Sequence, residues 1–178
     1  MQYRHEVKHE ISNLDMLILR QRLRAVMAPD SHAIDGQYEI RSLYFDNPDD
    51  KALREKLDGV SRREKYRIRM YNNDPSVIRL ERKFKCSGLG YKESALLTQA
   101  QACQIAGGDI HWMAASTDEV ILRFYTCLRN EGLAAKVIVD YTREPFVFVP
   151  GNVRVTLDYN IRTALGCTDF LNPHCTTI

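Results

Sequence analysis

The stretch from Ser61 to Lys92 decides the fold: Ser-Arg-Arg-Glu-Lys-Tyr-Arg-Ile-Arg-Met-Tyr (61–71), Asn-Asn-Asp-Pro-Ser (72–76) and Val-Ile-Arg-Leu-Glu-Arg-Lys-Phe-Lys (77–85), continuing to Lys92. Two runs with a period of two flank a turn rich in Asn, Asp and Pro, which predicts a β-hairpin. Charged side chains share one face of both runs, apolar side chains share the other, and Arg82 alone interrupts the apolar face. The charged face holds Lys65, Arg67, Arg69, Arg79, Glu81, Lys83 and Lys85, and the apolar face holds Tyr66, Ile68, Met70, Ile78, Leu80 and Phe84.

This stretch also concentrates the positive charge of the chain. Residues 61–92 contain 10 Lys/Arg and 3 Asp/Glu, whereas the remaining residues contain 15 Lys/Arg and 20 Asp/Glu. Like charges on neighbouring strands repel each other, and a polyanion on the charged face would relieve that repulsion. The alternative is a solvated face whose cations prevent aggregation at a sheet edge. The charge count leaves the two interpretations about evenly balanced.

The composition is that of an ordinary soluble protein. The chain has 178 residues, of which 44% are hydrophobic and 27% are charged, and we expect one domain over residues 1–178. The first residues carry charges before any apolar run, so we expect no signal peptide, and no apolar window approaches the ~18 residues of a membrane span. The five cysteines show no CxxC spacing and predict free thiols in a reducing, cytoplasmic environment.

Residues before the hairpin predict one strand, a helix, a second strand and a short helix. Residues 3–11 alternate, with Arg4, Glu6, Lys8 and Glu10 on one face. Ser12 can cap a helix with a buried stripe. We expect a strand over residues 37–46 and a short helix ending near residue 57. The stripe consists of Met16, Leu19, Leu23 and Val26.

Residues after the hairpin predict helices and a second hairpin. One helix covers residues 97–106. A second follows Ser116-Thr-Asp-Glu119, which is similar to a capping box. Strands over 136–149 and 152–162 then form a hairpin around Pro150-Gly151.

Several motifs together resemble a known family. Lys65-Tyr-Arg-Ile-Arg-Met-Tyr followed by Leu80-Glu-Arg-Lys is similar to the VTC domain, the polyphosphate-polymerase branch of the triphosphate tunnel metalloenzymes, or CYTH-like superfamily. Further motifs follow in the order of that family, so that the resemblance covers residues 3 to about 165. These are Arg4-His-Glu-Val-Lys-His-Glu-Ile, Ile40-Arg-Ser-Leu-Tyr-Phe-Asp, Glu55-Lys-Leu-Asp-Gly-Val, Val139-Asp-Tyr-Thr-Arg-Glu and Val153-Arg-Val-Thr-Leu-Asp.

The resemblance implies an α+β fold: an antiparallel β-barrel that forms a tunnel, with helices packed outside. Charged side chains would point into the tunnel and apolar ones outward under the helices. In the family a late strand with a Glu-x-Lys pair closes the barrel. Residues 163–178 contain neither Glu nor Lys. We therefore expect an incompletely closed barrel with an exposed strand edge, unless another chain supplies the strand.

The resemblance also assigns site residues. Arg67, Arg69 and Arg143 suit a phosphate clamp, because a guanidinium group donates to phosphate oxygens as a planar fork. Lys83 is assigned with them to catalysis. For substrate binding the resemblance assigns Lys92, Tyr141 and Arg154. We add Lys8, because a lysine suits a point-charge contact with phosphate, and Lys65, because it lies on the charged face of the hairpin. Arg154 has an alternative role, as an ion-pair partner of Asp158 on the same strand.

Two carboxylates are candidates for a metal site. Glu6 and Glu81 lie among cations, where a carboxylate can hold Mn²⁺ or Mg²⁺ against a triphosphate or can simply neutralise lysines. The implied activity is transfer of the terminal phosphoryl group of ATP to a growing polyphosphate chain, and the lacking Glu-x-Lys strand leaves that activity uncertain. The alternatives are a metal-dependent tripolyphosphatase or nucleoside triphosphatase, and a non-catalytic module that binds polyphosphate or inositol phosphates. Nucleic acid is not expected, because aromatic residues do not interleave with the cations on the charged face.

Overall fold

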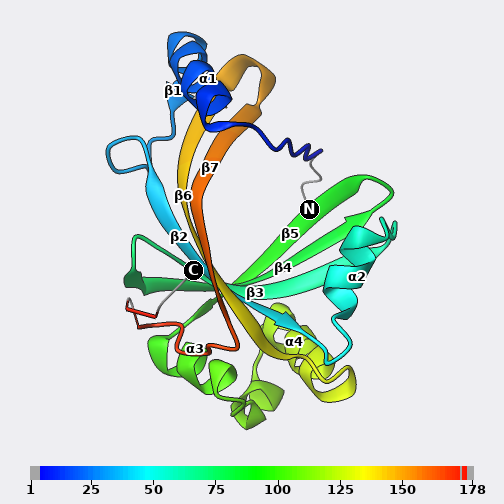
Figure 1. Ribbon diagram of the computed structural model, residues 1–178. Helices are drawn as coiled ribbons and strands as arrows, with labels where there is room; N and C mark the ends of the chain where they lie inside the picture. The colour runs from blue at the N-terminus through cyan, green and yellow to red at the C-terminus, as the bar shows by residue number, and fades with distance from the viewer. Residues whose placement is uncertain (1–4, 173, 176–178) are drawn as a thin grey trace.

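The computed structural model describes residues 5–172, 174 and 175 (Figure 1). No helix in this part of the chain is long and apolar enough to cross a membrane. In chain order the elements are α1 (Asn13–Val26), β1 (Ala28–Pro29), β2 (Tyr38–Asp46), α2 (Lys51–Leu57), β3 (Arg63–Tyr71), β4 (Asp74–Cys86), β5 (Leu89–Leu97), α3 (Gln99–Ala106), the 3-10 helix η1 (His111–Ala115), α4 (Glu119–Asn130), β6 (Ala134–Phe148), the 3-10 helix η2 (Val149–Gly151) and β7 (Val153–Leu165).

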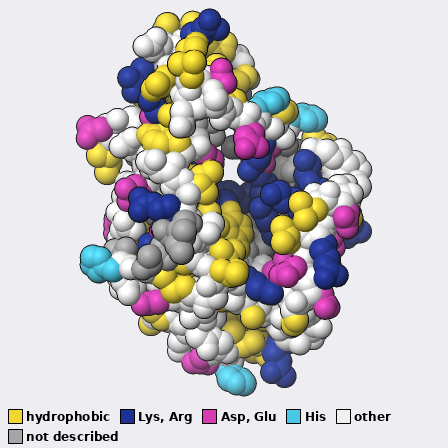
Figure 2. All heavy atoms as spheres, in the orientation of Figure 1, with side chains coloured by type: hydrophobic (Ala, Val, Ile, Leu, Met, Phe, Trp, Pro, Cys, Tyr) yellow, Lys and Arg dark blue, Asp and Glu magenta, His cyan; other side chains and the backbone are white. Residues whose placement is uncertain are grey.

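All strands belong to one antiparallel sheet. The order is β5-β4-β3-β2-β6, β7 pairs with β6 along nearly its whole length, and the short β1 pairs with the end of β6 at Phe146 and Val147. The sheet curls so that the β6–β7 arm and the β3–β4–β5 arm diverge from each other (Figure 1). The space-filling view shows a hollow between the two arms (Figure 2). Among the described residues β5 and β7 do not pair with each other, so the barrel is open. The predicted α+β tunnel fold with incomplete closure is confirmed.

Strands β3, β4 and β5, which contain most of the stretch 61–92, form a three-stranded meander. Tyr71 pairs with Asp74, which leaves Asn72 and Asn73 as a two-residue turn with φ of 52° and 51°. Two successive positive φ values match the right-handed twist of the flanking strands and favour Asn. The same arrangement recurs between β4 and β5 at Ser87-Gly88, with φ of 49° and 83°. The charged face therefore extends over three strands and includes Lys92 on β5.

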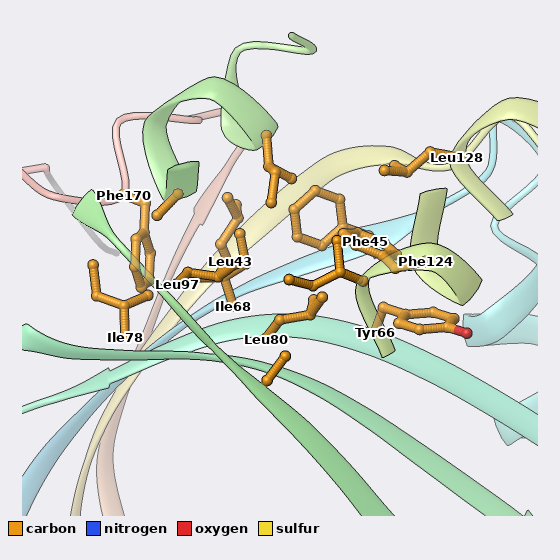
Figure 3. Packing of buried hydrophobic residues seen from close by; sticks show 14 of the residues in the cluster. Leu43, Phe45, Tyr66, Ile68, Ile78, Leu80, Leu97, Phe124, Leu128 and Phe170 are labelled. Carbon is orange, nitrogen blue, oxygen red and sulfur yellow. The ribbon is translucent and has the colours of Figure 1, made fainter. Parts of the chain in front are cut away.

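The apolar face of the meander forms the core under α3, α4 and η1 (Figure 3). Tyr66 stacks on Phe124 of α4 with ring centroids 4.8 Å apart, and Phe45 meets the same ring edge-on at 4.9 Å. Ile68 and Leu80 are fully buried beside them. Because side chains alternate along a strand, this packing fixes the charged side chains on the opposite face, toward the hollow.

Arg82 is buried within the apolar face and is neutralised there. Its guanidinium group donates to Glu64 at 2.7 Å and to Glu93 at 2.8 Å, and also to the hydroxyl of Tyr91. A buried charge is tolerated when it is paired and hydrogen-bonded in this way. The break in the sequence pattern is therefore a local ion-pair network, not a second functional surface.

Three local predictions were wrong. Of the strand predicted over residues 3–11, residues 3 and 4 lie outside the described residues. Residues 5–11 do not form a strand, because a period of two defines faces but does not supply a backbone partner. The predicted buried stripe of α1 does not form. Met16, Leu19 and Leu23 are half-buried and Val26 is 66% exposed, because α1 packs on one end of β6 instead of on the core.

The predicted capping box at the N-terminus of α4 does not form either. The Asp118 side chain caps this helix, since it accepts hydrogen bonds from two backbone N–H groups, so there is no Ser116–Glu119 capping box.

Candidate functional site

The hollow is lined by cations from three adjacent strands. Strand register places Lys65, Lys83 and Lys92 in one row across β3, β4 and β5, and places Arg67 opposite Glu81 in the next row. Arg69 follows on β3. We call Lys65, Arg67, Arg69, Lys83 and Lys92 the cationic face. Figure 2 shows Lys and Arg side chains gathered in the hollow between the two arms.

Glu81 lies at the centre of the cationic face and is 1% exposed. Arg67 donates Nε to Oε2 at 2.8 Å and brings a second guanidinium nitrogen to 2.6 Å from the same atom. Lys92 donates to Oε1 at 2.8 Å, and Arg69 lies 3.9 Å from Oε2. Burial by itself would raise the pKa of this carboxyl, but the charges of Arg67 and Arg69 and the hydrogen bond from Lys92 lower it to about 2. Glu81 therefore stays ionised and fixes the surrounding cations.

Tyr44 of β2 lies beneath two members of the cationic face. Its hydroxyl accepts a hydrogen bond from Arg67 at 2.9 Å, and the ammonium group of Lys65 lies 5.1 Å from its ring centroid. Burial alone would raise the pKa of this hydroxyl, but the charges of Arg67, Lys65 and Arg69 lower it to about 8. Burial together with the charges of Arg67 and Lys83 lowers the pKa of Lys65 to about 8 as well. The positive charge of the cationic face therefore decreases as the pH rises through about 8, because Lys65 loses a proton and Tyr44 becomes negative.

A hydrogen-bonded chain links the cationic face to β6. Arg69 donates to the Ser42 hydroxyl at 3.0 Å and to the Tyr141 hydroxyl at 2.8 Å. The guanidinium group of Arg143 lies 5.3 Å from the centroid of the Tyr141 ring. Tyr141 therefore stands between the two arginines, and burial raises the pKa of its hydroxyl. Lys65, Arg67, Arg69, Glu81 and Lys83 share the face that the alternation predicted, and Arg143 lies beside them across Tyr141.

The arginines on the β6–β7 arm have acidic partners of their own. Arg143 makes two hydrogen bonds of 2.6 Å to the two oxygens of Asp158. Arg154 pairs with Asp30 and donates to the Tyr38 hydroxyl at 2.7 Å. The proposed Arg154–Asp158 alternative is therefore wrong in its partner, since Asp158 binds Arg143. We call Arg143–Asp158 and Arg154–Asp30 the paired half of the hollow.

The N-terminal segment reaches the cationic face through Glu6. Its carboxylate pairs with the ammonium group of Lys83, and Lys8 lies 3.8 Å from its other oxygen. Burial would raise the pKa of Glu6, but the hydrogen bond from Lys83 and the charges of Lys83, Lys8 and Lys65 lower it. The side chain of Lys8 is 76% exposed, so this lysine lies at the rim of the hollow.

The described residues of the hollow do not form a ready site for a divalent metal. Glu81 gives one oxygen to Arg67 and the other to Lys92, and Glu6 binds Lys83. In the described part of the chain, three ligand groups come together only at Glu64, Cys127 and Glu131. That group lies on the opposite face of the sheet, beside a cavity of about 280 Å³, and its carboxylates bind Arg82 and Lys51. The assignment of Glu6 and Glu81 as metal ligands stays a prediction.

Sequence reasoning missed the contributions of β2 and of the loop before it. Ser42 and Tyr44 belong to the motif Ile40-Arg-Ser-Leu-Tyr-Phe-Asp, and they alternate there with buried Leu43 and Phe45. That alternation was a usable signal for two polar groups on the charged face. Asp30 carried no such signal, because its contact with Arg154 spans 124 residues.

Comparison with solved structures supports the fold. One match is a crystal structure of a candidate adenylate cyclase from Bacillus halodurans, with a TM-score of 0.54 and 14% sequence identity. The alignment covers 92% of this chain and 71% of that chain. At this identity the likeness shows the fold alone. The comparison with curated proteins found no match.

The family is shown by the sequence itself. The family model for the VTC domain matches residues 3–175, which is nearly the whole chain. This range contains every member of the cationic face and of the paired half. The chain therefore belongs to the VTC domain family.

Proposed function

We propose that the hollow binds the triphosphate of ATP and inorganic polyphosphate, and that the protein transfers the terminal phosphoryl group of ATP to a polyphosphate chain. One observation carries the proposal: within residues 5–172, 174 and 175, the five cations of the cationic face share only two carboxylates, Glu81 and Glu6. Membership of the VTC domain family and the tunnel fold support a function related to polyphosphate or triphosphate.

The charge balance of the cationic face favours a polyanion over a single anion. Five positive and two negative side chains leave a local excess of about three charges when Lys65 is protonated, and these like charges repel one another across neighbouring strands. Successive phosphates can contact arginines through planar forks and lysines through point charges. A linear polyphosphate could therefore replace several repulsive contacts at once.

Phosphoryl transfer needs alignment and charge neutralisation more than covalent participation by the protein. In the proposed reaction an oxygen of the polyphosphate end attacks the γ-phosphorus of ATP, the bond to the β-phosphate oxygen breaks, and ADP leaves with the electron pair. Arg67, Arg69 and Lys83 would hold the transferred group and neutralise its oxygens. Arg143 is assigned to the same task, but it would first have to release Asp158.

Two alternatives use the same hollow. Water could replace the polyphosphate end as acceptor, which would make the protein a tripolyphosphatase or nucleoside triphosphatase. A non-catalytic binding module is favoured by the open sheet, because water in the hollow raises the local dielectric and weakens stabilisation of developing charge. We therefore expect clear anion binding and slow turnover from this chain.

Nucleic acid is a weaker candidate, although the sequence argument against it was incomplete. Tyr44 and Tyr141 do lie among the cations, but Lys65 and Arg67 cover one ring and Arg69 and Arg143 cover the other. A base that stacked on either ring would have to displace a cation. Competition between single-stranded RNA and tripolyphosphate tests this point.

The experiment that tests the proposed function has two parts. Isothermal titration with tripolyphosphate tests binding, and incubation with ATP, with and without Mn²⁺, followed by gel sizing of the products, tests turnover. Long polymer supports the polymerase, free phosphate alone supports a phosphatase, and binding without product supports the binding module. Absence of tripolyphosphate binding at low salt would overturn the proposal, because low salt is the condition in which such contacts are strongest.

A further inference from the structure

The N-terminal segment crosses the mouth of the hollow. It runs from Ser12, which caps α1 beside β6, toward β4 and β5 on the other arm (Figure 1). Residues 5–11 form no helix or strand. Within the described chain, the side-chain ion pairs of residues 5–11 are the contacts of Glu6 with Lys83 and with Lys8. The segment is therefore fastened to the cationic face through one carboxylate.

Glu6 binds Lys83 as a phosphate oxygen would. Its two carboxylate oxygens are hydrogen-bond acceptors that carry negative charge, and they lie within reach of Lys83 and Lys8. Both partners of the Glu6–Lys83 pair remain partly exposed, at 47% and 32% of their side chains. Exposed pairs of this kind contribute only about 0–1 kcal/mol, so a multivalent anion can displace Glu6.

We propose that Glu6 is an internal competitor of phosphate at Lys83, and that the N-terminal segment must leave the cationic face when a polyphosphate occupies it. This inference rests on the proposed function of the hollow. Glu6 therefore lowers the affinity for polyphosphate, because the ligand must displace Glu6 from Lys83 and must approach past the negative charge of Glu6 at the mouth of the hollow. The central carboxylate, Glu81, cannot act in this way, since it is buried on β4 and is held by Arg67 and Lys92.

Substitution of Glu6 tests the competition with a matched control. We expect Glu6→Gln to tighten tripolyphosphate binding by about 2- to 5-fold, which is the effect of removing a competing exposed ion pair. Glu10→Gln changes the same charge in the same segment, but Glu10 has no ion pair with any described residue, and we expect less than about a 1.5-fold change on the same grounds. Equal effects of the two variants would overturn the proposal.

A double-variant cycle tests whether Glu6 acts through Lys83. We expect the gain from Glu6→Gln to disappear when Lys83→Met is already present, because the competition needs both partners. An undiminished gain in that background would contradict the proposal. Wild-type protein that fails to bind tripolyphosphate would instead overturn the proposed function, so the two failures are distinguishable.

Limited proteolysis tests the movement of the segment. Trypsin cleaves after Lys8, which lies within residues 5–11. We expect saturating tripolyphosphate to accelerate cleavage at Lys8 in the wild type and to have little effect in Glu6→Gln, whose segment is already released. Slower cleavage in the presence of tripolyphosphate would show that the segment closes over the ligand, and would overturn the competition.

Discussion

Each half of the hollow carries two arginines, the cationic face adds three lysines, and the halves differ in how these charges are neutralised. In the paired half, Arg143 and Arg154 each have an aspartate of their own. In the cationic face, Arg67, Arg69 and Lys92 share the single carboxylate of Glu81. The β6–β7 arm therefore carries arginines in separate one-to-one ion pairs, whereas β3–β5 carry arginines and lysines that outnumber their carboxylates.

The number of arginines and lysines alone therefore does not locate an anion-binding site. A paired arginine must give up its carboxylate before it can bind phosphate, and the lost pair offsets the new one. A cation that shares its carboxylate with other cations is less completely neutralised, so a phosphate can bind it without displacing a counter-ion of its own. We therefore expect the cationic face to contribute most of the binding free energy.

The largest effect is expected on stability at Glu81. Glu81→Gln removes the buried charge that holds Arg67, Arg69 and Lys92, and breaking such a buried pair costs about 3 kcal/mol of unfolding free energy. Asp158→Asn, in the paired half, should cost less than about 1 kcal/mol because its ion pair is partly exposed. Urea denaturation measures both values. Equal losses of unfolding free energy in Glu81→Gln and Asp158→Asn would contradict the proposed difference between the cationic face and the paired half.

Tripolyphosphate should compensate for the loss of Glu81. With the central carboxylate neutralised, the cationic face repels itself more strongly, and a bound polyanion stabilises the folded state by mass action. We expect tripolyphosphate to raise the melting temperature of Glu81→Gln by more degrees than that of the wild type. A smaller rise in the variant would mean that Glu81 takes part in binding the anion, for example as a metal ligand.

The next effect is on anion affinity. Arg67→Gln and Lys83→Met should each weaken tripolyphosphate binding by about 10- to 100-fold, because each removes a charged hydrogen bond of roughly 1.5–3 kcal/mol. Arg154→Gln should weaken it by less than about 3-fold, since Arg154 is already bound to Asp30. Lys51→Ala, on the surface helix α2, serves as the control. Titration calorimetry measures these values, and a larger loss at Arg154 than at Lys83 would reverse the assignment of the halves.

The smallest effect concerns pH. The pKa values of Lys65 and Tyr44 both lie at about 8. As pH rises through 8, Lys65 loses a positive charge and Tyr44 gains a negative one, so both changes weaken anion binding. Tripolyphosphate also loses a proton and gains negative charge over this range, so the wild type is compared with Tyr44→Phe at each pH. We expect the affinity of the wild type relative to Tyr44→Phe to fall by about 3-fold between pH 7 and pH 9. A ratio that does not fall would contradict the description of the face.

The alternating pattern was sufficient to predict the β3–β4 hairpin and its two faces, but it did not predict the third strand, β5, that pairs with β4. Tyr66, Ile68 and Leu80 are buried as expected, and Arg67 and Lys83 lie on the opposite face. Periodicity succeeds here because both faces have partners, the core on one side and the counter-ions on the other. It failed at residues 5–11 because alternation does not provide a neighbouring strand.

Pairing between charges could not be predicted from the sequence. Asp30 and Arg154, or Glu6 and Lys83, come together only because the sheet curls and the N-terminal segment returns across its mouth. Long-range ion pairs of this kind leave no local pattern. They nevertheless decide which of the predicted cations remain available, so the paired half could be separated from the cationic face only with the structure.

A crystal structure of the protein with bound tripolyphosphate would test the central claim most directly. We predict phosphate oxygens within hydrogen-bonding distance of Arg67 and Lys83, with Glu6 displaced from Lys83 and the Arg143–Asp158 pair intact. Phosphates bound to Arg143 and Arg154, with the Glu6–Lys83 pair preserved, would contradict the claim that the cationic face is the polyphosphate-binding surface.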